Sequence, residues 1–244
     1  MPYLRASKRK WILVGLLVGL VIIGTFFVSL WIQKPRRPQT THAEASIPLP
    51  APETRGTVSV EEAISRRRSI REYSKQPLTL RELSQLLWAA QGITEHKWKL
   101  RAAPSAGATY PIEVYVVVGE DDVVGLSPGV YQYIPDGHEL RLLFLGDVRD
   151  QLSSASLGQA WVAQAPVDLV ITAVYERTTM RYGDRGVRYV HMEAGHVAEN
   201  IYLEATALNL GTVAVGAFED EEVQKVLGLP GDHKPLYVMP VGHI

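Results

Sequence analysis

The sequence predicts an α+β fold for a chain of 244 residues. Helical and strand-like segments follow one another without the regular alternation that builds a doubly wound parallel sheet. No strand-like run is followed by Gly-x-Gly-x-x-Gly or by a Walker loop, which argues against a Rossmann or P-loop domain. The length suits one domain with a full core, or at most two small ones.

Charge and composition exclude several classes of function. The formal net charge of -1 provides no general attraction to nucleic acid, so no nucleic-acid partner is expected. The absence of cysteine excludes disulfides, thiolate metal sites and a cysteine nucleophile. His191 and His196 do not share a helix face, and no metal site is expected from them. Any redox chemistry therefore needs a cofactor.

The first 57 residues are expected to lie outside the folded domain. Residues 1–10 form a basic segment, and residues 11–32 are an apolar run without charge that is long enough to span a bilayer. A cleaved signal peptide is the alternative, but its apolar region is usually about 7 to 15 residues long. Residues 33–57, rich in proline, alanine and threonine, predict a flexible stalk. The sequence thus predicts a single-pass membrane protein, and a small basic excess favours a catalytic domain outside the cytoplasm.

The folded domain is predicted over residues 58–244 and begins with two helices. Their starts carry the capping-box pattern, in Ser59-Val60-Glu61-Glu62 and in Thr79-Leu80-Arg81-Glu82. Leucine and alanine then repeat at helical spacing, and Gly92 is placed to end the second helix.

The remaining elements alternate irregularly. The strand-like runs are residues 112–118, 130–134, 140–145, 167–174, 212–218 and 236–241. Further helices are expected from Asp147 to about Ser156, over 187–210, and from Asp220 to Leu227. Residues 177–188, with four arginines and two glycines, predict a mobile loop near a site, with an ordinary solvated loop as the default alternative. Gly195, in the middle of the longest helix, costs roughly 1 kcal/mol against alanine, which indicates close packing at that point.

A cluster of arginines at the end of the first helix is the strongest functional signal. The six residues 66–71 read Arg-Arg-Arg-Ser-Ile-Arg. Adjacent arginines repel one another, and guanidinium groups with a serine hydroxyl suit the oxygens of a phosphate. A solvated basic surface or a membrane-surface patch is the alternative for this segment alone.

Four blocks of sequence, in this order, resemble the nitroreductase family. Residues 65–73 resemble its opening Arg-Arg-Ser-x-Arg-x-Phe/Tyr motif, and residues 104–113 resemble the Pro-Ser-Gly-Gly-x-Tyr-Pro-x-Glu variant of its SagB/ThcOx branch. Residues 188–200 and 211–218 also resemble that branch. The resemblance covers about residues 57–244.

This resemblance implies an FMN-dependent nitroreductase-like sandwich, with a mixed, largely antiparallel sheet flanked by helices. It also implies a homodimer with non-covalent FMN at the subunit interface. The residues implied to surround the ribityl phosphate are Arg67, Arg68, Ser69 and Arg71. Those implied along the edge of the isoalloxazine ring are Pro104, Ser105, Ala106 and Gly107. Backbone N–H groups near flavin N5 and O4 are implied for Val215 and Gly216.

Two positions depart from the pattern of the family. Many members complete the phosphate site with a Lys or Arg after the last strand, where this chain offers only His243. The azoline oxidases of the branch use a Lys-Tyr pair as catalytic base. Arg188 and Tyr189 are the nearest equivalent, and Arg is a poor base because it stays protonated. The catalytic residue is therefore not assigned.

The expected function is that of a membrane-anchored, FMN-dependent oxidoreductase. It would transfer hydride equivalents between a donor such as NAD(P)H and a small organic or peptide-derived substrate. Within the fold, the alternatives are an azoline-to-azole dehydrogenase of peptide modification and a flavin-consuming or dehalogenating relative. Outside catalysis, the alternatives are a membrane-tethered flavin sensor and a membrane scaffold whose arginines meet anionic lipid. Bound, reducible flavin would remove the scaffold, and turnover would remove the sensor.

Overall fold

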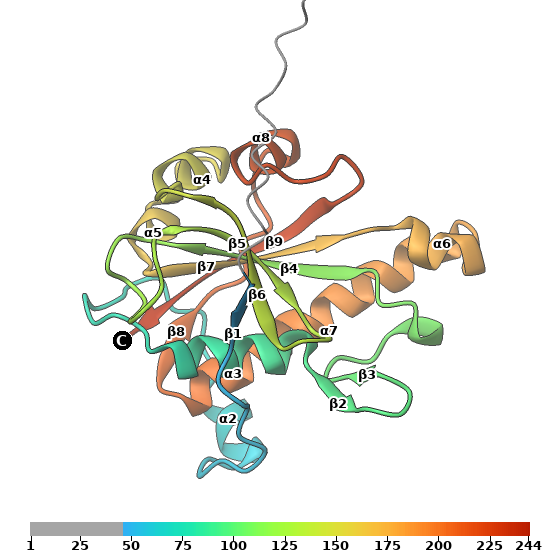
Figure 1. Cartoon of the computed structure of the whole chain (residues 1–244), viewed down its shortest axis with the longest axis horizontal. Helices are drawn as coiled ribbons and strands as arrows, with labels where there is room; N and C mark the ends of the chain where they lie inside the picture. The colour runs from blue at the N-terminus through green and yellow to red at the C-terminus, as the bar shows by residue number, and fades with distance from the viewer. Residues whose placement is uncertain (1–45) are drawn as a thin grey trace, which may run out of the picture. The chain divides into compact units, whose positions relative to one another are not determined.

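The computed structural model describes residues 46–244 and centres on a sheet of seven strands (Figure 1). The strands of this sheet are β1 (Ser46–Pro48), β4 (Ile112–Val118), β5 (Gly129–Ile134), β6 (Glu139–Leu145), β7 (Val167–Ala173), β8 (Leu210–Thr212) and β9 (Lys234–His243). Their order is β1-β6-β5-β4-β7-β9-β8, and all neighbouring pairs are antiparallel. A separate hairpin pairs β2 (Ile93–Glu95) with β3 (Leu100–Arg101). The predicted α+β class with a largely antiparallel sheet is confirmed.

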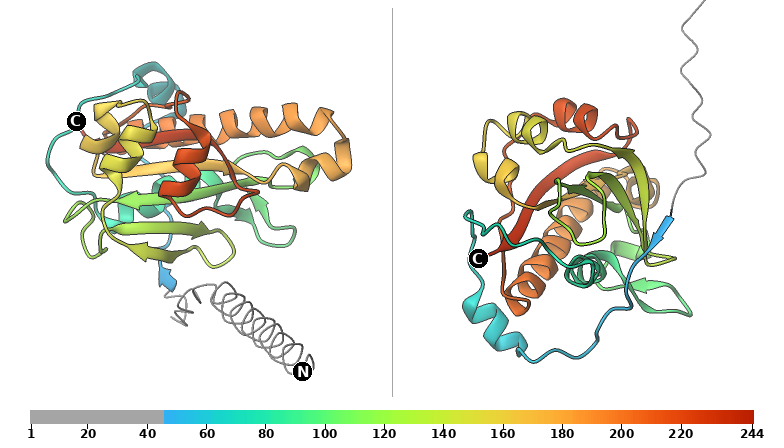
Figure 2. Two further views of the ribbon diagram at one scale, coloured as in Figure 1. Left: turned by 90° about the horizontal axis from the view of Figure 1, so that it is seen from above. Right: turned by 60° about the vertical axis from the view of Figure 1, so that its left-hand side comes forward.

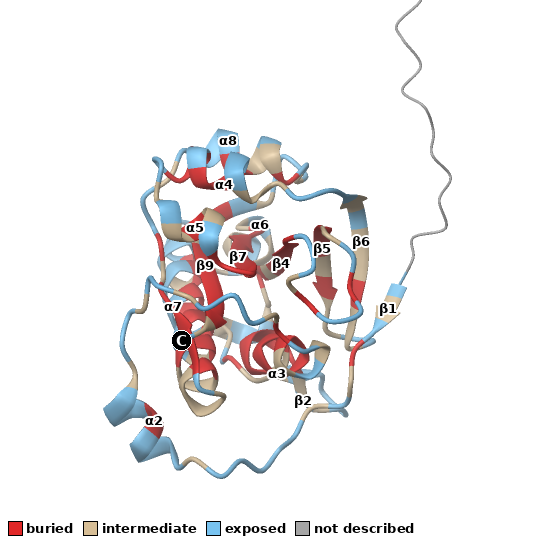
Figure 3. Cartoon of the chain, turned by 90° about the vertical axis from the view of Figure 1, so that its left-hand side faces the viewer, coloured by how far each residue is buried: buried red, intermediate tan, exposed pale blue. Residues whose placement is uncertain are grey.

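Helices cover both faces of the sheet (Figure 2). The helices are α2 (Val60–Arg66), α3 (Leu80–Gln91), α4 (Arg149–Ala155), α5 (Ala160–Gln164), α6 (Glu176–Tyr182), α7 (Arg185–Ala207) and α8 (Asp220–Val226), with the 3-10 turn η1 (Ala106–Ala108). Helices α3 and α7 pack on one face, and α4, α5 and α8 pack on the other. Figure 3 shows buried residues on the sides of α3 and α7 that meet the sheet.

Burial on both faces explains the continuous apolar runs of the central strands. Along β4, Val114 and Val116 belong to the core under α3 and α7. Tyr115 and Val117, which point to the opposite face, belong to the core under α4, α5 and α8. Apolar residues are therefore required at successive positions rather than at alternate ones.

The predicted start of α3 is confirmed. The Thr79 side chain accepts from the backbone N–H of Glu82, and the Glu82 carboxylate accepts from the N–H of Thr79. At the start of α2, Ser59 caps Glu62 as predicted, but the Glu62 carboxylate pairs with Arg66 instead of reaching back. The capping box at the start of α2 is therefore only half formed.

Three other predictions need correction. Residues 177–188 are not a mobile loop, because they form α6 and the start of α7. The expected strand over 212–218 is short: β8 ends at Thr212, and beyond it Val215 alone bridges to Val238 of β9. The helix expected from Asp147 begins at Arg149 with Val148 at the N-cap position, but the Asp147 carboxylate does accept from the N–H of Arg149 at 3.1 Å.

The prediction of a single-pass membrane protein with an external catalytic domain is contradicted. No helix within residues 46–244 has both the length and the apolar character needed to cross a bilayer. The segments 1–10 and 11–32 lie outside the described residues. Residues 46–57, expected in the flexible stalk, instead lie on the domain: Ser46–Pro48 pairs with β6, and Leu49 is buried in the core.

Candidate functional site

The segment that follows α2 lies against the edge of the sheet at β8. The backbone N–H of Ile70 donates to the carbonyl of Thr212 at 2.9 Å. The Ser69 hydroxyl lies 3.0 Å from the Tyr202 hydroxyl of α7, and the same Tyr202 oxygen accepts from the N–H of Ala214 at 2.8 Å. Tyr202 therefore joins the arginine cluster to the segment after β8.

Arg66 of this cluster pairs with Glu62, whereas Arg67 and Arg71 have aromatic rather than acidic neighbours. The guanidinium carbon of Arg67 lies 5.1 Å from the ring centroid of Tyr202, and that of Arg71 lies 5.5 Å from the ring of Trp161. Arg68 donates to two backbone carbonyls of its own turn, at 3.1 and 2.6 Å. Among residues 46–244, none of the three forms an ion pair with a carboxylate. Three of the four arginines of the cluster, Arg67, Arg68 and Arg71, thus have no anionic partner among these residues.

The two backbone N–H groups predicted after β8 differ in availability. The N–H of Val215 donates to the carbonyl of Val238 at 2.9 Å, so it cannot also serve a ligand. The predicted role of Val215 as a donor to a ligand is therefore not compatible with the structure. Gly216 is exposed, and its N–H has no acceptor within residues 46–244.

The loop predicted along a flavin edge is held by α6 and by its own serine. The Ser105 hydroxyl accepts from the N–H of Tyr110 at 2.9 Å. Gly107 has a φ of 62°, and its carbonyl accepts from Nη1 of Arg181 at 3.0 Å. A Cβ at Gly107 would lie 2.5 Å from the Tyr182 hydroxyl, so glycine is needed for this close approach. Pro104 and Ala106 lie in the same loop.

A buried carboxyl group of α7 supports this loop from below. Glu193 is 2% exposed, and Ser105 lies near its carboxyl group. Burial raises the pKa of Glu193 to about 7, and the neighbouring Ser105 hydroxyl and the charge of Arg101 oppose that rise. Its Oε1 has no partner among the described residues, nor has the buried Nε2 of Gln91.

The predicted site residues fall into two groups at different positions along α7 (Figure 1). Ser69 meets the helix at Tyr202, and Ser105 meets it at Glu193. At 1.5 Å per residue, these two positions are about 14 Å apart along the helix axis. Within one chain, the fold brings the arginine cluster together with Gly216, and it keeps residues 104–107 at the far end.

The remaining candidates have other contacts. Arg188 is exposed, and the ring of Tyr189 packs edge-on against Tyr182 at 5.2 Å between centroids. The ring of His243 lies 3.5 Å from the Glu82 carboxylate. Neither observation identifies a catalytic base or a residue that completes the arginine cluster.

Three residues of this region were missed in the sequence. Glu193 carried a signal, because it occupies the apolar face of α7 between Val190 and Val197, where a carboxyl group is out of place. Arg181 belonged to the segment predicted to be a loop. Tyr202 had no signal, because tyrosine is an ordinary residue on a partly buried helix face.

The donor set fits a ligand that carries a phosphate. Guanidinium groups without acidic partners, a neighbouring hydroxyl and a free backbone N–H provide several charge-assisted and neutral donors. FMN offers the matching groups, because its phosphate accepts from arginine and serine and its ring edge accepts from a backbone N–H.

Comparisons with known proteins agree with this reading. The model of the nitroreductase family matches residues 64–243. The chain is 52% identical over 185 residues to a Methanocaldococcus jannaschii protein described as a nitroreductase, which covers 76% of this chain and 91% of that protein.

Solved structures show the same architecture. A protein of Ralstonia eutropha described as a nitroreductase superposes with a TM-score of 0.72 at 32% identity, over 85% of this chain and 93% of that one. A chain of the Escherichia coli microcin synthetase McbBCD complex, solved with truncated pro-MccB17 bound, gives a TM-score of 0.66 at 26% identity, over 79% and 75% of the two chains.

Proposed function

The chain belongs to the nitroreductase family, and from this premise we propose that it is an FMN-dependent oxidoreductase. It passes hydride equivalents from a donor such as NAD(P)H to a small organic acceptor. Each turnover moves one hydride and one proton, so that a nitro compound yields a nitroso product and water. No separate nucleotide-binding domain is needed if donor and acceptor use the same site in turn.

The observation that carries this proposal is that Arg67, Arg68 and Arg71 of the arginine cluster have no acidic partner among residues 46–244. Arg67 and Arg71 hold the phosphate of FMN, with the hydroxyl of Ser69 as a further donor. Arg68 contributes less, because its guanidinium is already bonded to backbone carbonyls. When bound, FMN supplies the capacity to accept a hydride and release it again.

Gly216 and Tyr202 act on the flavin ring and on the segment beside it rather than on the phosphate. The free N–H of Gly216 donates to the polar edge of the flavin ring and raises its affinity for electrons. Tyr202 fixes this segment relative to the phosphate site, because its hydroxyl is bonded to both Ser69 and the N–H of Ala214. A fixed donor pays little reorganisation cost during the reaction.

The loop of residues 104–107 completes the site of a second copy in a homodimer. The outer side of α7 supports such an interface. Gly195 is exposed, and beyond the backbone of its own helix no atom lies within 4 Å of a built Cβ; Met192 is 51% exposed. Packing of two α7 helices would fill this space and bring the loop of one chain to the arginine cluster of the other.

A peptide-derived acceptor is the second candidate, favoured by the similarity to the microcin synthetase chain. Proton abstraction from such a substrate needs a base. Arg188, nearest to the expected Lys-Tyr pair, is exposed and stays protonated. We therefore place the small organic acceptor first.

Titration of FMN and of riboflavin into Arg67→Ala tests the proposal. Loss of charge-assisted bonds worth about 1.5–3 kcal/mol should weaken FMN binding roughly 10- to 150-fold. Riboflavin lacks the phosphate, so its weaker binding should change little. Arg66→Ala is the matched control, because Arg66 is paired with Glu62 and should leave FMN affinity within about twofold.

Two results would contradict the assignment. Unchanged FMN affinity in Arg67→Ala would move the phosphate elsewhere, and equal losses for both ligands would indicate damage to the fold. Wild-type protein with bound FMN should also oxidise NAD(P)H when a nitroaromatic acceptor is added. A protein that binds flavin but does not catalyse turnover would instead match the alternative of a non-catalytic flavin sensor.

A further inference from the structure

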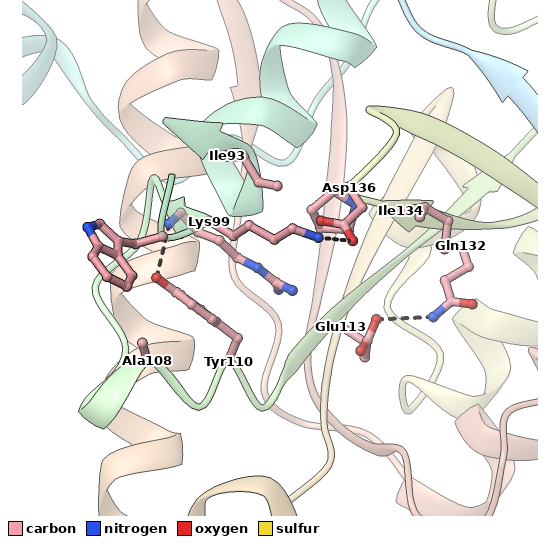
Figure 4. A pocket seen from close by; sticks show the side chains of 11 residues that line it. Ile93, Lys99, Ala108, Tyr110, Glu113, Gln132, Ile134 and Asp136 are labelled. Atoms are coloured by element: carbon pink, nitrogen blue, oxygen red, sulfur yellow. Dashed lines mark hydrogen bonds and ion pairs between the residues drawn. The ribbon is translucent and has the colours of Figure 1, made fainter. Parts of the chain in front are cut away.

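A cavity lies between the β2–β3 hairpin and strands β4 and β5. It has a volume of about 470 Å³ and contains none of the residues assigned to FMN. Ala108 and Tyr110, which follow the loop of residues 104–107, form one wall, and Ile93 and Ile134 contribute apolar surface (Figure 4). The cavity is large enough for a small aromatic molecule.

Most charges of this cavity are already paired. Lys99 reaches from the hairpin to Asp136, with 2.8 Å between Nζ and Oδ2 (Figure 4). Glu113 binds Nη1 of Arg177 at 2.5 Å and accepts from the Gln132 amide at 3.1 Å. These pairs shape the cavity without leaving a charge for a ligand.

Arg101 is the exception. Its Nη1 donates to the amide oxygen of Gln91 at 2.8 Å, and its guanidinium carbon lies 4.6 Å from the ring centroid of Tyr110. Within residues 46–244 it forms no ion pair, and its Nε and Nη2 have no acceptor. Burial lowers the pKa of Arg101, and the neighbouring charge of Glu113 offsets this only in part. A half-buried cation thus presents two adjacent donors beside an aromatic ring.

We propose that this cavity binds small aromatic monocarboxylates, with the carboxylate on Nε and Nη2 of Arg101 and the ring beside Tyr110. A carboxylate matches the two parallel donors of a guanidinium edge. The exposed indole of Trp98 adds apolar surface to the wall. A dianion such as a phosphate monoester is disfavoured, because Glu113 and Asp136 line the same space. Because Ala108 and Tyr110 follow the loop of residues 104–107, the cavity borders the proposed flavin site. The inference names the acceptor class of the proposed oxidoreductase and rests on that proposed function.

Binding of two isosteric probes to the full-length protein tests the inference. Isothermal titration is carried out with 4-nitrobenzoate and with the neutral 4-nitrobenzamide. Wild type should prefer the carboxylate at least about tenfold, and Arg101→Gln should lose about 10- to 100-fold for the carboxylate and less than about threefold for the amide. Lys99→Gln, which removes a paired cation of the same cavity, should change both affinities by less than about threefold.

A second variant keeps the test independent of folding. Arg101→Lys retains the positive charge but not the two-pronged edge, so it should keep an intermediate preference for the carboxylate. Equal losses for both probes in Arg101→Gln, or no preference in wild type, would overturn the proposal. Carboxylate binding that depends on Arg101 without NAD(P)H oxidation would uphold the cavity and refute the oxidoreductase. NAD(P)H oxidation without carboxylate binding at Arg101 would uphold the oxidoreductase and refute the proposed carboxylate site.

Discussion

At the scale of single residues, Glu193 connects folding to the candidate site. Its carboxyl group is buried on the apolar side of α7 and lies near Ser105, in the loop assigned to the partner's flavin. Burial raises the pKa of Glu193 from the ordinary 4.5 to about 7. The folded protein therefore holds a proton here, over a pH range in which the unfolded chain has lost it.

The raised pKa of Glu193 makes the free energy of unfolding depend on pH. Between pH 4.5 and about 7 the folded state binds more protons than the unfolded state, so stability falls as pH rises and levels off above that range. Glu193→Gln cannot lose a proton and should lack this part of the slope, which is at most about 3 kcal/mol. Urea unfolding at pH 5, 6, 7 and 8 measures it. Equal slopes in wild type and variant would show that Glu193 titrates normally.

Asp168 provides a parallel case for comparison. It lies in β7 with both carboxyl oxygens buried and without partners among the described residues, and burial raises its pKa well above the ordinary value. Its slope should persist in Glu193→Gln and disappear in Asp168→Asn. Both carboxyl groups occupy positions in apolar segments, which signals burial, but the sequence does not show whether a partner meets them. The arginine cluster was readable, because its members are adjacent in sequence, but the bonding of Arg68 to backbone depends on the local turn.

At the scale of elements, capping and periodicity predicted α3 and the central strands within a residue or two. The error at residues 177–188 has a packing cause. Gly186, taken as a loop signal, is buried against α6, where a Cβ would lie 2.9 Å from the Cα of Thr179. This glycine allows close helix contact instead of flexibility. The sequence does not distinguish these two uses, because the contact partner lies on another element.

The segment after β8 offers a matched pair of substitutions. Gly216→Pro removes the free N–H assigned to the flavin ring, whereas Gly216→Ala keeps it. A Cβ here would lie 3.6 Å from a ring carbon of Tyr237, an ordinary contact, so the alanine variant should fold normally. The proline variant should weaken FMN binding or shift the flavin reduction potential, and the alanine variant should do neither. Spectroelectrochemical titration decides the case, and equal potentials in all three proteins would remove Gly216 from the site.

At the scale of the whole molecule, the α+β class followed from the irregular order of helices and strands. The sequence did not predict that the candidate site is split between two positions along α7. The four motif blocks carry no information about which chain of a dimer supplies each block. The resemblance places the arginine cluster and the loop of residues 104–107 around one ligand. In a single chain they approach α7 at two positions that are about 14 Å apart along the helix axis. A homodimer resolves this separation, and its outer α7 surface is open at Gly195.

Mixed dimers of two defective chains test this arrangement. One chain carries Arg67→Ala, and a differently tagged chain carries Gly107→Val, which strains a backbone with φ of 62° and crowds Tyr182. Each homodimer should bind little FMN. If each site takes its arginines from one chain and its loop from the other, the mixed dimer has one intact site and should regain half of the wild-type flavin content. If one chain supplies both, every site in the mixed dimer keeps one defect, and the purified heterodimer should remain as empty as the two parents.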